Sequence, residues 1–173
     1  MATEKAPVSS VENSVLARSV IIACVILTTL FILLLYFQNN LARFFGQYAD
    51  EATIGLMLMA LWLVVSSTIR SLNNLVKGME TWKLLLGGLL IGLLSSLLTT
   101  AYLIVFPDVA KSQNTSEVTG ATGGLILVIS AIAFIISVIS VINMRVRSRT
   151  LGNILELLII GGAIAGLVWF ATK

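Results

Sequence analysis

The sequence predicts an all-α integral membrane protein with five transmembrane helices. Of its 173 residues, 58% are hydrophobic and only 11% are charged, and the mean hydropathy is +1.03. A typical water-soluble domain is less apolar and has about 25% charged residues. Besides this composition, a set of continuous apolar runs predicts the same class, because such runs lack the alternating pattern of an outer-membrane barrel. We therefore take lipid to be the solvent around most of the chain.

Five apolar runs have about the length of a membrane-spanning helix, which needs roughly 20 residues. The runs are residues 19–37, 52–69, 84–106, 121–144 and 151–171. The second run is the shortest and is marginal, whereas the other runs can cross the bilayer comfortably. Residues 1–18 are polar and are expected to form a short cytoplasmic tail. Residues 19–173 then make up a single transmembrane domain.

Lys and Arg residues alternate between rich and poor segments along the chain. In the tail, the four loops and the C-terminal end they number 2, 1, 3, 1, 3 and 1. Because cytoplasmic loops carry an excess of basic residues, this alternation predicts a cytoplasmic N-terminus and an external C-terminus. We expect the protein in a bacterial cytoplasmic (inner) membrane. Arg145 and Arg147 are most simply topology determinants, and contact with anionic lipid headgroups is the alternative.

Two connecting segments have helical patterns of their own. Leu41, Phe44, Phe45 and Tyr48 recur at i, i+3, i+4 and i+7. This spacing predicts a helix lying in the outer membrane interface, or a face that docks a partner. Apolar residues also recur at helical intervals in residues 70–83. Either the second and third spans continue beyond the bilayer, or a short interfacial helix joins them.

An internal repeat relates residues 52–106 to residues 121–171. Four glycines of the first copy each have a counterpart 74 positions later, pairing Gly78 with Gly152, Gly87 with Gly161, Gly88 with Gly162, and Gly92 with Gly166. Coincidence in a chain rich in leucine and glycine is the alternative. If the repeat is real, one helix is followed by two tandem hairpins that have the same orientation in the membrane.

Small residues form seams along three of the predicted helices. In lipid, hydrophobicity contributes little to helix association, and small residues let two backbones approach closely. The simpler interpretation is that these seams pack within the bundle. The alternative is that they contact another subunit. The helix-packing candidates are Gly87, Gly88, Gly92, Ser95, Thr99, Ser130, Ala133, Ser137, Gly161, Gly162 and Gly166.

Residues that could carry chemistry are scarce. The chain has no His and only one Cys, Cys24, which excludes imidazole acid–base catalysis, a His metal site and a thiolate cluster. It also lacks a phosphate-binding glycine loop and a basic aromatic surface. We therefore expect neither an enzyme nor a nucleic-acid partner, and the sequence identifies no cofactor.

Glu156 is the only acidic residue within a predicted span. A charge at the centre of a span costs about 2.5 to 3.5 kcal/mol on insertion scales, which makes Glu156 a candidate site. It lies near the cytoplasmic end of its span and shares a broad helix face with Arg149 and Asn153. A hydrogen-bonded carboxylate close to the interface is the simpler interpretation, and an ion or proton site is the alternative.

Together these features predict a non-enzymatic integral membrane protein that acts by helix packing. Its expected role is that of a small accessory or assembly subunit of a membrane protein complex. Its partners would be the lipid bilayer and either other membrane subunits or further copies of itself. The alternative is a small oligomeric channel or transporter, with Glu156 near an ion or proton path.

Overall fold

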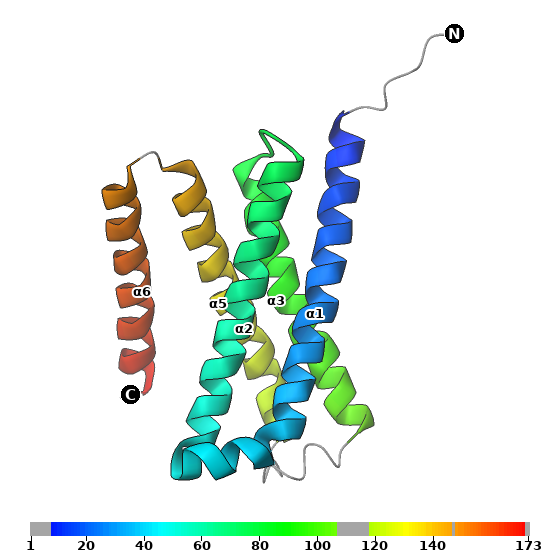
Figure 1. Ribbon diagram of the computed structural model, residues 1–173, viewed down its shortest axis with the longest axis vertical. Coiled ribbons are helices and arrows are strands. Elements are labelled where there is room, and N and C mark those ends of the chain that lie inside the picture. Colours follow the sequence, from blue (N-terminus) through cyan, green and yellow to red (C-terminus); the bar gives the residue numbers. More distant parts are fainter. Residues whose placement is uncertain (1–7, 107–117, 147, 172–173) are drawn as a thin grey trace.

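The computed structural model describes residues 8–106, 118–146 and 148–171, which form helices and short connections. The helices are α1 (Val8–Phe45), α2 (Ala49–Leu75), α3 (Thr81–Val105), α5 (Val118–Arg145) and α6 (Arg149–Ala171), and a 3-10 turn, η1 (Gly46–Tyr48), joins α1 to α2. The helices run up and down as a bundle, and α6 stands at its edge (Figure 1). The predicted all-helical class is confirmed.

Four of these helices are long and apolar enough to cross a membrane. The candidate spans are Val11–Gln38, Glu51–Leu75, Thr81–Val105 and Ile126–Arg145. They overlap the first four predicted spans, which supports a bilayer as the environment of the chain. The fifth predicted span lies in α6, a helix of 23 residues. Its side chains beyond Gly162 are outside the described residues, so the fifth crossing stays a prediction.

Helix α1 extends well beyond the predicted span at its N-terminal end. It begins at Val8, so residues 8–18, which were expected to form part of the tail, are helical. The physical reason is a buried stripe that continues upward from the first span. Glu12 and Val20 are 9% and 4% exposed, and Leu16, midway between them, packs against the same core. These side chains at four-residue intervals keep the extra turns against the bundle.

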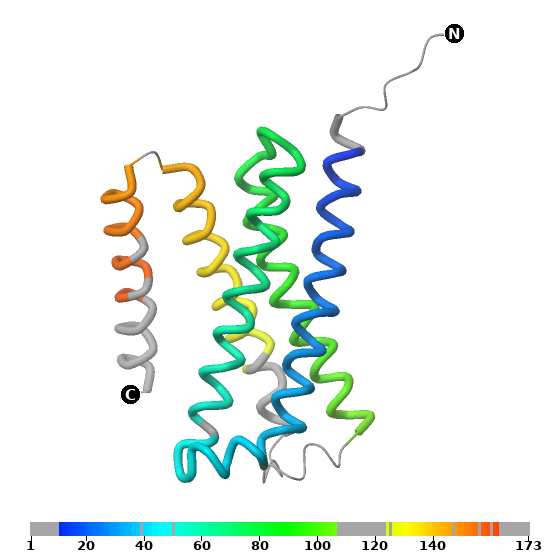
Figure 2. The backbone as a smooth tube through the Cα atoms, viewed as in Figure 1, coloured from blue at the N-terminus to red at the C-terminus, as the bar shows by residue number. Residues whose placement is uncertain are grey.

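The predicted interfacial helix is the lower end of α1 followed by η1. The chain turns across the bottom of the bundle there and leads into α2 (Figures 1 and 2). Phe44 is 86% exposed and Tyr48 is 62% exposed. Aromatic side chains at this position suit the headgroup region of a bilayer, where their amphipathic rings are favoured.

The connection between α2 and α3 is a short turn. Helix α2 ends at Leu75 and α3 begins at Thr81, so the two spans extend as helices and no separate interfacial helix joins them. Gly78 within the turn has a φ of +91°, a backbone conformation that glycine adopts without steric cost.

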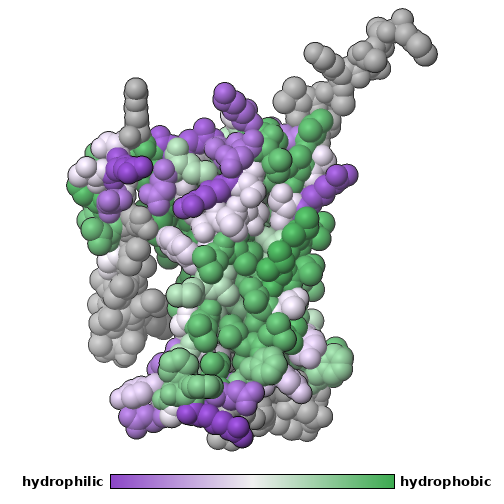
Figure 3. Space-filling model, viewed as in Figure 1, coloured by the Kyte–Doolittle hydropathy of each residue, from purple (hydrophilic) through white to green (hydrophobic). Residues whose placement is uncertain are grey.

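The core lies between α1, α2, α3 and α5. The largest contacts are those of α3 with α5 and of α1 with α2, whereas α6 packs mainly on α5. On the face seen in Figure 3, hydrophilic residues gather at the two ends of the bundle, and the described surface between them is mostly hydrophobic. The large side chains that are fully buried in the core include Leu27, Leu61, Ile69, Leu72, Met79, Leu84, Ile91 and Ile139.

The start of α1, the α2–α3 turn and the α5–α6 connection lie at one end of the bundle (Figure 1). The basic loops of the sequence therefore share one side, which we call the cytoplasmic end in accordance with the positive-inside rule. The absolute orientation in the membrane and the internal repeat both stay predictions.

Candidate helix-packing site

The glycine seam of α3 packs directly against the small-residue seam of α5. A Cβ atom built on Gly88 would lie 1.5 Å from Ser137 Oγ, and one built on Gly92 would lie 2.4 Å from the Cβ of Ala133. Contacts this short do not occur between real side chains, so only glycine fits at these two positions. The close approach of the backbones supplies the van der Waals contact on which helix association in lipid depends.

Gly87, next to Gly88, faces a different helix. A Cβ atom on Gly87 would lie 3.6 Å from Leu16 Cδ1 and 3.8 Å from Val20 Cγ2, both on α1. These are ordinary van der Waals distances. The glycine pair therefore lets α3 contact α1 on one side and α5 on the other.

Several buried hydroxyl groups of the seam bond to their own helix. Thr99 Oγ1 donates to the Ser95 carbonyl at 2.8 Å, and Ser137 Oγ donates to the Ala133 carbonyl at 2.7 Å. In a hydrocarbon environment each unpaired polar group is costly, and a bond to the carbonyl four residues earlier satisfies the donor locally. These side chains can therefore act as small packing residues.

Other buried hydroxyl groups on the same two helices have no such bond. Ser95, Ser130 and Ser140 are 0%, 6% and 5% exposed, and their Oγ atoms, like Oγ1 of Thr100 on α3, have no hydrogen-bond partner among the described residues. A buried donor without a partner costs about 1 to 3 kcal/mol. These atoms are buried polar positions that remain open to a further interaction.

The glycines of α6 have a different environment from those of α3. Gly161 and Gly162 are exposed, and no atom of the described residues lies within 4 Å of a Cβ built on either one. Gly87 and Gly88, their counterparts in the predicted repeat, are covered by α1 and α5. Gly166 belongs to the same helix, but its surroundings are outside the described residues. The described part of the α6 seam is thus not covered by any other described helix.

The predicted polar site near the start of α6 is described only in part. Arg149 and Asn153 are exposed, whereas the side chain of Glu156 and all of Arg147 lie outside the described residues. Arg145 is described, and its Nη2 atom donates to the Met79 carbonyl in the α2–α3 turn at 2.6 Å. Contact of these arginines with lipid headgroups stays a prediction.

An ion pair that the sequence analysis missed joins α1 to α3 at the cytoplasmic end. Lys83 Nζ lies 2.9 Å from Glu12 Oε2, and the two side chains are 15% and 11% exposed. Glu80 lies 3.8 Å from the same Nζ atom and accepts a hydrogen bond from Trp82 Nε1. One sequence feature could have indicated that Glu12 is buried: it lies four residues before Leu16, on the same helix face. The identity of its partner depends on the tertiary fold.

Within the described part of the chain, no cluster of three or more His, Cys, Asp or Glu residues could hold a metal ion. Comparison with known proteins finds no matching family model, no matching curated protein and no matching solved structure. Function is therefore inferred from the contacts described above.

Proposed function

We propose that this chain is a non-enzymatic integral membrane protein that acts by helix packing, as a small accessory or assembly subunit of a membrane protein complex. The observation that carries the proposal is the contrast between two glycine pairs. Gly87 and Gly88 are covered by other helices of the chain, whereas a Cβ atom on Gly161 or Gly162 would meet no atom of the described residues within 4 Å. Glycines on a helix in lipid gain close contact only when another transmembrane helix covers them.

The side chains beside these glycines support the same role. Leu157 and Leu158 precede Gly161 and Gly162 by one helical turn and are 70% and 66% exposed. They therefore lie on the same helix face as the glycines. A partner helix on this face would fit its side chains into the shallow groove at the glycines. It would also pack against the neighbouring leucine side chains.

Gentle detergent extraction followed by mass measurement of the intact particle tests this proposal. We expect the chain to leave the membrane together with other polypeptides, because the open face of α6 is the docking surface. The Gly162→Leu substitution should release those polypeptides, since a bulky side chain prevents close approach of the partner helix.

The matched control is Gly55→Leu. Gly55 is an exposed helical glycine of α2, and no atom of the described residues lies within 4 Å of its Cβ position, so this variant tests the effect of an added leucine in lipid. Association should persist in it. A stable homo-oligomer without other polypeptides contradicts the accessory-subunit role, and equal loss in both variants contradicts the assignment to α6.

The second candidate function is that of a small oligomeric channel or transporter with Glu156 near an ion or proton path. Buried hydroxyl groups that have no partner among the described residues, including those of Ser95, Ser130 and Ser140, favour it because they are polar atoms in the interior of the bundle. Flux into liposomes is the test, with Glu156→Gln compared to the unchanged chain. We expect the substitution to reduce flux, and absence of flux under every gradient applied contradicts transport.

A further inference from the structure

A groove runs along the outer side of α1 and α2, starting near the cytoplasmic end. Its first part has a volume of about 310 Å³, and the adjoining part has a volume of about 250 Å³. Both parts are lined by Leu63 and Val64, so they form one continuous depression. It faces the region that the bilayer occupies, and no other described helix covers it.

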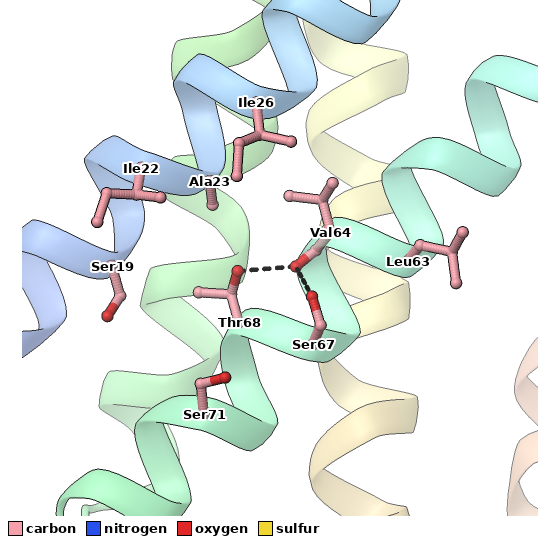
Figure 4. A pocket seen from close by; sticks show the side chains of 9 residues that line it. All are labelled: Ser19, Ile22, Ala23, Ile26, Leu63, Val64, Ser67, Thr68 and Ser71. Carbon is pink, nitrogen blue, oxygen red and sulfur yellow. Dashed lines mark hydrogen bonds between the residues drawn. The ribbon is translucent and has the colours of Figure 1, made fainter.

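The polarity of the lining changes along the groove. Ser19 of α1 and Ser67, Thr68 and Ser71 of α2 line the first part (Figure 4). Thr68 Oγ1 and Ser67 Oγ donate to the same Val64 carbonyl, at 2.7 Å and 3.1 Å, which leaves their oxygen lone pairs available. The adjoining part is lined only by apolar residues. A groove of this kind matches a molecule with a polar end and a hydrocarbon end.

Two arginines flank the cytoplasmic mouth of the groove. Arg18 lies four residues before Ile22, and Arg70 lies three residues after Ser67, so each arginine shares a helix face with a residue that lines the groove. Both arginines are exposed, and among the described residues neither has an ion-pair partner. The mouth is therefore positively charged, with two guanidinium groups available to an anion.

We propose that this groove binds one phospholipid with an anionic headgroup, taken from the cytoplasmic leaflet. Arg18 and Arg70 hold the phosphate, because guanidinium groups bind phosphate oxygens through paired hydrogen bonds. The hydroxyl groups of Ser19 and Ser71 lie where the ester oxygens of the lipid enter the groove. One acyl chain follows the apolar part between α1 and α2. This site is separate from the α6 face, and it does not depend on the function proposed above.

Native mass spectrometry of the full chain in detergent, titrated with phosphatidylglycerol or with phosphatidylcholine of the same acyl chains, tests the proposal. We expect one phosphatidylglycerol to bind more tightly than phosphatidylcholine. A basic residue near an anionic lipid surface contributes about 1 kcal/mol, so Arg18→Gln should weaken phosphatidylglycerol binding about fivefold and the double variant with Arg70→Gln about 30-fold.

Two further variants make the result specific. Arg43→Gln removes an exposed arginine at the opposite end of α1 and should leave phosphatidylglycerol binding unchanged. Ser67→Leu fills the groove and keeps both arginines, and it should abolish the tight binding event. Equal binding of the two lipids, an equal loss in Arg43→Gln, or a polypeptide that co-purifies and cross-links to position 67 in place of lipid would each overturn the proposal.

Discussion

Gly92 shows why a single methyl group matters where α3 meets α5. A Cβ atom there would lie 2.4 Å from the Cβ of Ala133 and 3.2 Å from the carbonyl oxygen of Ile129. Neither of these atoms is the flexible end of a long side chain, so the helices themselves would have to move apart. Overpacking of this kind costs up to about 3 kcal/mol, which exceeds the gain of about 1 kcal/mol in helix propensity from replacing a glycine.

We therefore expect Gly92→Ala to lower the free energy of unfolding by about 2 kcal/mol, the difference between these two effects. Ala133→Gly in the same chain should restore part of the loss, because it removes the atom that the new methyl group meets. Reversible unfolding in mixed micelles measures both values. If Gly92→Ala had the same stability with and without Ala133→Gly, positions 92 and 133 would not be in contact.

At the scale of single residues, the sequence could identify packing positions and not their partners. The seams with Gly88 and Gly92 on α3 and with Ala133 and Ser137 on α5 were visible because small residues recur at helical spacing. Nothing in that spacing indicates whether the two seams face each other or face another subunit. The missing information is tertiary, and the ion pair of Glu12 was missed for the same reason.

The turn between α2 and α3 illustrates how one residue determines the geometry of an element. Gly78 has a φ of +91°, and the next residue, Met79, is 1% exposed and accepts a hydrogen bond from Arg145. The turn therefore places the buried side chain and the backbone acceptor of Met79 directly after a left-handed residue. A residue with a Cβ is strained in this backbone conformation.

Gly78→Ala should lower the free energy of unfolding by about 1 to 2 kcal/mol, although no atom of the described residues lies within 4 Å of the added methyl group. The matched substitution Gly55→Ala is in a helix with the same open surroundings and should not lower stability, because alanine favours helix. Thermal unfolding in detergent compares the two variants. If both lowered stability equally, backbone strain at Gly78 would be excluded as the cause.

At the scale of elements, hydropathy located the helices better than it located their ends. The run 19–37 lies within α1, which extends from Val8 to Phe45. Hydropathy detects contact with lipid, whereas the end of a helix depends on where its backbone hydrogen bonds stop. At the start of α1 the extra turns are held by contacts of Glu12 and Leu16 with other helices. An average of hydropathy over neighbouring residues contains no information about such tertiary contacts.

The orientation of the whole molecule can be tested with single cysteines. Cys24 is buried and can be replaced by Ala to give a chain without thiols. In that background a membrane-impermeant maleimide should label Arg43→Cys in intact cells, and it should label Lys77→Cys only after permeabilisation, because basic loops face the cytoplasm. Labelling of both from outside would contradict the predicted topology.

At the scale of the molecule, composition alone was sufficient for the membrane class, because only a protein largely surrounded by lipid tolerates so many apolar residues on its surface. The number of spans and the repeat are more difficult to predict. They depend on α6, where the glycine spacing matches α3 and the surroundings do not. Similar spacing can accompany different packing, since packing depends on which helices are available nearby.

The ion pair between Glu12 and Lys83 also has a consequence for the order of events during synthesis. The two residues are 71 positions apart in the chain, so a ribosome makes the carboxylate long before its cation. Until α3 has been inserted, Lys83 cannot pair with the Glu12 carboxylate, so we expect the first turns of α1 to stay in contact with water and lipid headgroups. We therefore expect these turns to dock late in biogenesis, when α3 joins the bundle.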